Sequence, residues 1–152
     1  MGIEQRLAEL GIELPPAPVP VASYVPVKIV GNIAFVAGQI ARVDGEMIHP
    51  GHLGAEVSVE QGQEAARLCA LQALAALREA LGGLEGLKGI ARVEVFVASV
   101  AGFTDLPAVA NGASDLFAEV MGQDGVHARA AVGVAELPLG ASVEVVVVAE
   151  VN

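Results

Sequence analysis

The sequence predicts an α+β protein in which two helices pack on one face of a largely antiparallel or mixed β-sheet. Three observations predict this class: apolar runs that alternate like strands, two segments with apolar residues at helical spacing, and turn residues between them. In chain order these segments give a strand pair, a helix, a strand, a second helix and a closing pair of strands. The helices cover one sheet face, so the other, valine-rich face is expected to be uncovered in a single subunit.

The chain of 152 residues is expected to form a single domain, with a core at residues 23–152. Residues 1–22 are predicted to form a short helix followed by a proline-rich arm, and nothing in them is typical of a signal peptide. The apolar face of this helix consists of Ile3, Leu7 and Leu10. Residues 14–20 contain four prolines, which fix the backbone in an extended form, so we expect an arm that leads to Tyr24.

A β-hairpin is predicted next, because two apolar segments, 27–30 and 33–38, flank the turn pair Gly31-Asn32. A second turn is predicted at Asp44-Gly45, a pair that favours left-handed backbone conformations.

The longest predicted helix begins at a capping box, in which the Ser58 hydroxyl accepts from an early amide and Gln61 stands three positions later. It continues to Leu81, where Gly82-Gly83 provides the stop. Its stripe at three- and four-residue spacing includes Ala65, Leu68, Cys69, Gln72, Leu74, Leu77 and Leu81.

An alternating segment at residues 92–99 predicts a half-buried strand, and a second helix follows it. This helix is capped by Thr104 or Asp105 and has Pro107 in its first turn, where proline is tolerated. Its inner face is predicted to consist of Val109, Leu116, Phe117 and Val120.

Two strands, at about 130–135 and 143–151, close the chain, and Arg129 is the only cation in the last sixty residues. Arg129 lies in an apolar run typical of a buried strand, where an unpaired guanidinium is costly. We therefore expect an anionic partner, which is either Glu144 on the last strand or the carboxylate of a ligand.

Composition limits the classes of function. Hydrophobic residues make up 54% of the chain, yet no apolar stretch has the length of a spanning helix, so we expect no membrane insertion. The apolar excess instead predicts a homo-oligomer. The net charge of −10 disfavours nucleic-acid binding. The single cysteine, Cys69, allows no disulfide framework, and the expected location is the cytoplasm.

Four segments occur in a characteristic order: 36–40, 103–111, 127–132 and 135–144. Together they resemble the Rid family, the reactive intermediate deaminases, which are also called L-PSP endoribonucleases. The resemblance covers about residues 20–152, and the proline-rich extension indicates a longer branch. It implies a chorismate-mutase-like fold and a homotrimer with a central barrel and intersubunit sites. The implied reaction is the cofactor-free hydrolysis of enamines or imines, such as 2-aminoacrylate, to a 2-keto acid and ammonia.

The resemblance also implies site residues. Arg129 matches an arginine whose planar fork of donors fits a carboxylate, and Glu144 matches a glutamate that orients or deprotonates water. The implied substrate-binding residues are Tyr24, Gly38, Gln39, Asn111 and Arg129. The family's hydroxyl before Gly-Gln and its cysteine after the arginine are replaced by Ala37 and Ala131, so we expect a more apolar pocket.

Each of these residues also has a structural interpretation. Arg129 would form a structural ion pair with Glu144 or with an acid from a neighbouring subunit, and Glu144 would otherwise be a solvated strand residue. Tyr24 would anchor an interface, and Asn111 would bond local backbone.

The three histidines raise the question of a metal. His49 and His52, with Glu56 nearby, resemble a ligand cluster, but the Pro-Gly between the histidines is not a zinc signature, so no metal is expected. His127 is expected either to border the cleft or to pack at an interface.

Two other functions stay open. The same cleft would suit a non-catalytic protein that binds a small carboxylate. The older family name suggests an endoribonuclease, which the acidic charge disfavours.

Overall fold

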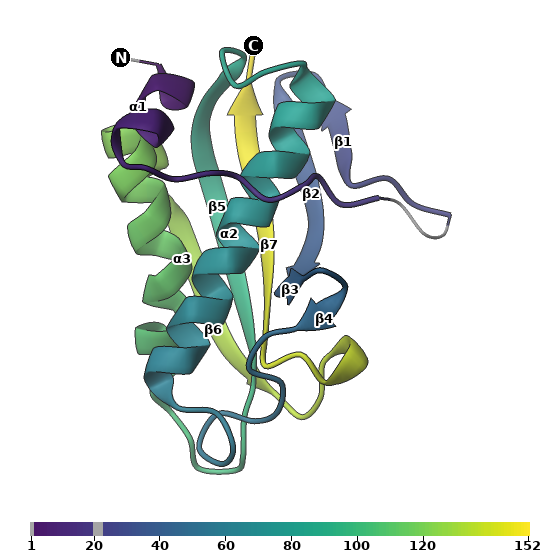
Figure 1. Cartoon of the computed structure of the whole chain (residues 1–152), viewed down its shortest axis with the longest axis vertical. Helices are drawn as coiled ribbons and strands as arrows, with labels where there is room; N and C mark the ends of the chain where they lie inside the picture. The colour runs from purple at the N-terminus through teal and green to yellow at the C-terminus, as the bar shows by residue number, and fades with distance from the viewer. Residues whose placement is uncertain (1, 20–22) are drawn as a thin grey trace.

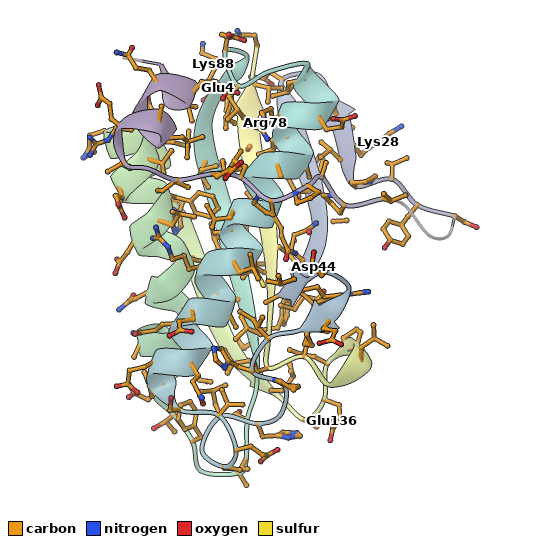
Figure 2. All side chains as sticks on the ribbon, viewed as in Figure 1. Glu4, Lys28, Asp44, Arg78, Lys88 and Glu136 are labelled. Atoms are coloured by element: carbon orange, nitrogen blue, oxygen red, sulfur yellow. The ribbon has the colours of Figure 1, made fainter. Side chains whose placement is uncertain are left out.

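The computed structural model describes residues 2–19 and 23–152. The end of the predicted proline-rich arm, at residues 20–22, lies outside the described residues. The predicted first helix is confirmed as α1 (Ile3–Glu9), and an ion pair of 3.8 Å between Glu4 and Arg78 ties it to the next helix (Figure 2). From α1 the arm crosses that helix toward the first strand (Figure 1).

Five strands form one mixed sheet in the order β1-β2-β7-β5-β6, and a small hairpin of β3 and β4 lies beside it. Their bounds are β1 (Val27–Val30), β2 (Ile33–Ile40), β3 (Arg42–Val43), β4 (Glu46–Met47), β5 (Leu87–Ala98), β6 (Ala128–Val134) and β7 (Val143–Val151). Among the strands of the described residues, β5 and β6 pair in parallel and the other pairs are antiparallel. Both predicted turns are confirmed, at Gly31-Asn32 and at Asp44-Gly45.

The closing strands do not pair with each other, contrary to the expected strand pair. β7 inserts between β2 and β5, whereas β6 lies at the sheet edge. β6 follows β5 through a helix, and a crossover of this kind returns the chain parallel to the strand it left. β5 begins five residues before the predicted start, because register shifts near Gly89 and Arg92 hide the alternation.

Two helices, α2 (Val59–Leu81) and α3 (Leu106–Met121), lie side by side over one face of the sheet, as predicted (Figure 1). The capping box at the start of α2 is confirmed: Gln61 N donates to Ser58 Oγ over 3.1 Å, and Ser58 N donates to Gln61 Oε1 over 3.0 Å. Gly82 ends α2 in the left-handed conformation.

The core lies between these helices and the inward side chains of the sheet. On β7 the inward residues are Val143, Val145, Val147, Ala149 and Val151, all buried. No helix of residues 2–19 or 23–152 covers the other sheet face (Figure 1), which remains apolar, as predicted, with Val30, Phe35 and Val132 exposed. No helix in the described part of the chain has the length and apolar character needed to cross a membrane.

Candidate functional site

Arg129 lies on β6 and is held by the adjacent helix. Its Nη1 donates to Asn111 Oδ1 over 2.8 Å and to Ser114 Oγ over 3.2 Å. Asn111 and Ser114 are three residues apart on α3, so they lie on the same helical face. The structure thus brings together two predicted site residues, Arg129 and Asn111, and adds Ser114, which sequence reasoning missed.

The expectation that Arg129 lies on a buried strand is wrong. β6 is an edge strand, and Arg129 is exposed together with Ala128 and Val132. Water therefore solvates the guanidinium, and no acidic partner is required. Within the described residues no carboxylate lies within 4.0 Å of Arg129, so neutral oxygens orient the charge and leave it unneutralised.

Glu144 faces the opposite side of the sheet from Arg129, so the ion pair considered for these two residues is not formed within the described chain. On β7 the neighbours Val143 and Val145 point into the core, which turns Glu144 to the open face. Arg129 is the register partner of the buried Val93 and bonds to α3, so it lies on the helix side. One chain therefore presents two candidate half-sites on different faces: Arg129 with Asn111 and Ser114 on the helix side, and Glu144 with Gly38 on the open face.

Gly38 and Glu144 form the half-site on the open face. β2 has an irregularity between Val36 and Gln39, and the residues between them bulge from the ladder. A Cβ atom at Gly38 would overlap Oε2 of Glu144, so the carboxylate packs directly against the Gly38 backbone. Partial burial disfavours the charged form and raises the pKa of Glu144 above its ordinary value. The protonated form of Glu144 is therefore more favoured than that of a fully exposed glutamate.

Gln39 points away from that half-site, into the core, where only 5% of it is exposed. Gln72 on α2 donates to Gln39 Oε1 over 3.3 Å and to Ile40 O over 2.8 Å, and it accepts from Arg42 N over 3.1 Å. This buried network stabilises the backbone next to the bulge. Any contact of Gln39 with a ligand on the open face therefore involves its backbone.

Gln72 is a second polar residue whose importance sequence reasoning missed. The signal was present, since an amide within an apolar helical stripe must find hydrogen-bond partners when it is buried.

The remaining residues that the resemblance singled out are Tyr24, Ala131 and Ala37. Tyr24 precedes β1, is 54% exposed, and makes no side-chain hydrogen bond with the described residues; its ligand role stays a prediction. Ala131 is half-buried and packs against the core on the same face of β6 as Arg129. Ala37 is half-buried next to Gly38.

The two loop histidines bind different partners and do not converge. His49 Nε2 lies 2.7 Å from Glu64 Oε2, whereas His52 Nε2 lies 2.8 Å from Ala135 O and 3.4 Å from Glu136 Oε2. The Ala135 carbonyl, followed by the neighbouring acids, raises the pKa of His52. Glu136 lies at the end of the molecule away from the termini (Figure 2). No group of three or more potential metal ligands occurs among the described residues.

Comparisons with known proteins agree on one family. Residues 4–151 match the family described as "YjgF/chorismate mutase-like, putative endoribonuclease". The chain is 45% identical over 151 residues to Protein TCP17 of Trypanosoma cruzi, covering 99% of this chain and 94% of that protein.

Solved structures show the same fold. The protein Atu1372 of Agrobacterium tumefaciens has a TM-score of 0.91 at 44% identity, covering 99% of this chain and 92% of that one. A protein of Shewanella oneidensis described as a "putative endoribonuclease" has a TM-score of 0.94 at 34% identity, covering 99% and 100%. Escherichia coli TdcF, crystallised with bound serine, has a TM-score of 0.63 at 26% identity, covering 90% and 94%.

Proposed function

Since the chain belongs to the YjgF/Rid family, we propose that it hydrolyses small enamine or imine intermediates derived from amino acids, giving a 2-keto acid and ammonia without a cofactor. The observation that carries this proposal is the exposed guanidinium of Arg129, which two neutral oxygens orient and no nearby carboxylate of the described chain neutralises. Such a group is available to an anionic substrate. The family match confirms the resemblance inferred from the sequence.

Arg129 supplies the carboxylate anchor. Both of its hydrogen bonds use Nη1, so within the described residues Nε and Nη2 have no partner. These two nitrogens form one edge of the guanidinium and donate two parallel hydrogen bonds to a carboxylate. The serine bound to TdcF is an amino acid held by a protein of the same fold, which supports a small carboxylate as the ligand class.

Glu144 of a neighbouring copy completes the site in this proposal, because one chain presents Arg129 and Glu144 on opposite faces of its sheet. The uncovered apolar face gives the association its driving force. We propose the homotrimer with a central barrel that is typical of the family, with the site in the cleft between subunits.

The reaction then proceeds in two steps. Arg129 holds the carboxylate of the imino acid, and the Glu144 carboxylate takes a proton from a water molecule as the water oxygen bonds to the imine carbon. The C=N electron pair moves to nitrogen, which takes that proton from Glu144, so that a carbinolamine forms. In the second step Glu144 takes the proton of the new hydroxyl and passes it to nitrogen, the C–N bond breaks, ammonia leaves, and the carbonyl of the 2-keto acid forms. The raised pKa of Glu144 favours return of the proton.

Glu144→Gln is expected to keep carboxylate binding and lose turnover. With 2-aminoacrylate generated in situ by a dehydratase, the wild type should accelerate pyruvate and ammonia formation, and the variant should be slower by about 10² to 10⁴. Wild-type activity should rise with pH as Glu144 ionises, above the ordinary glutamate range, because only the carboxylate form accepts a proton. This rise should be absent in the variant.

Glu150→Gln is the matched control, since Glu150 stands on the same strand and the same sheet face but is exposed. It should retain wild-type rates. A Glu144→Gln variant as active as the wild type would remove Glu144 from the mechanism. Pyruvate binding by the wild type without any turnover would instead identify a carboxylate-binding protein.

An endoribonuclease is disfavoured by the net charge of −10, which repels a phosphate backbone.

A further inference from the structure

A chain of hydrogen bonds continues behind Arg129 into the protein. Ser114 Oγ, which accepts from Arg129 Nη1, lies 2.9 Å from His127 Nε2. His127 Nδ1 lies 2.6 Å from Gly125 O. The chain therefore runs from the guanidinium through a hydroxyl and an imidazole to a backbone carbonyl.

The donors and acceptors of a neutral imidazole fit this chain in only one way. Gly125 O can only accept, so His127 carries its proton on Nδ1. His127 Nε2 is then an acceptor, and the Ser114 hydroxyl donates to it. Because the hydroxyl proton is used there, a lone pair of Ser114 faces Arg129, whose Nη1 can only donate.

The imidazole is fixed by packing as well as by hydrogen bonds. The rings of His127 and Phe117 meet edge to face, with centroids 5.9 Å apart and planes at 85°. Phe117 is fully buried in the inner face of α3. Gly125 belongs to a short 3-10 helix (Gly122–Gly125), and a Cβ atom there would overlap the Phe117 carbonyl. The carbonyl that orients His127 is thus held close to α3.

We propose that Ser114 and His127 are positioning residues that aim Arg129 at its carboxylate ligand. Nη1 carries two protons, and Asn111 and Ser114 accept one each, so the guanidinium plane is set and its Nε and Nη2 edge is presented outward. The inference rests on the proposed role of Arg129 as the carboxylate anchor. In this proposal neither Ser114 nor His127 touches the ligand.

The first test measures pyruvate binding by calorimetry. Ser114→Ala should weaken binding about three- to tenfold, because one of the two hydrogen bonds that set the guanidinium plane is lost, whereas Ser114→Thr keeps the hydroxyl and should bind like the wild type. His127→Phe keeps an aromatic ring but removes both ring nitrogens from the hydrogen-bond chain, so it should match Ser114→Ala. The double variant should be no weaker than either single variant, because both remove the same chain.

His127→Gln offers an acceptor near Ser114 and should restore most of the affinity. His49→Phe is the control, since His49 lies outside the chain and bonds Glu64. Binding that is unchanged in Ser114→Ala and His127→Phe but lost in Arg129→Ala would overturn the positioning role and leave the proposed function standing.

The second test does not depend on ligand. Long-range ¹H–¹⁵N correlation of the histidine rings, recorded at a pH where the rings are neutral and with His127 assigned from the His127→Gln spectrum, should show His127 protonated at Nδ1. A ring protonated at Nε2 would overturn the proposal. If the wild type binds no pyruvate, the proposed function fails, and the positioning role fails with it. The His127 tautomer then tests the hydrogen-bond chain by itself.

Discussion

Replacing Arg129 by alanine is expected to remove carboxylate binding and, with it, turnover. Two charge-assisted hydrogen bonds would be lost from the Nε and Nη2 edge, which at about 1.5 kcal/mol or more each amounts to a factor of at least about 100 in affinity. Calorimetry with pyruvate and kcat/KM with 2-aminoacrylate measure the two effects. The fold should be unaffected, because Arg129 is exposed on an edge strand.

Two further arginine variants sharpen this test. Arg129→Lys retains the charge but not the planar fork, so it should bind with intermediate affinity. Arg67→Ala removes a half-buried arginine whose partner is Glu119, and it should bind pyruvate like the wild type. Wild-type affinity in Arg129→Ala would show that the anchor lies elsewhere.

Gly38→Ala is expected to lower turnover by about 100-fold with little loss of stability. The new Cβ would overlap the Glu144 carboxylate, which is the end of a flexible side chain and can turn away at low cost to folding. A catalytic group displaced by about 1 Å commonly loses this much rate. Steady-state kinetics and thermal unfolding of the same samples measure both effects.

Gly86→Ala is the matched control for Gly38→Ala, because a Cβ at Gly86 would meet no other atom within 4 Å. It should retain full activity. Full activity of Gly38→Ala at unchanged stability would contradict the close packing of Gly38 on a functional Glu144.

Local features of the fold could be predicted from the sequence because local residues determine them. The capping box at Ser58, the left-handed Gly82 and the turn at Asp44-Gly45 each depend on neighbours within a few positions. The strand order could not be predicted, since β7 inserts between two strands that are distant in the sequence. A run rich in alanine and valine is found in buried strands and in edge strands alike. The sequence therefore did not reveal that β6 is exposed.

In the candidate site, too, some features could be predicted from the sequence and others depend on tertiary packing. Arg129, Asn111, Gly38 and Glu144 followed from the resemblance, and the structure pairs the first two and the last two. These two pairs lie on different faces of the sheet, and this depends on which residues of each strand point toward the helices. The supporting contacts of Ser114 depend on how α3 docks on β6, which no local pattern encodes.

The most direct test of the central claim is a crystal structure of the assembled protein soaked with pyruvate. We expect the pyruvate carboxylate on Nε and Nη2 of Arg129, with Nη1 still bonded to Asn111 and Glu144 of a neighbouring copy close to the keto carbon. Pyruvate bound elsewhere, with that edge of Arg129 unoccupied, would contradict the account.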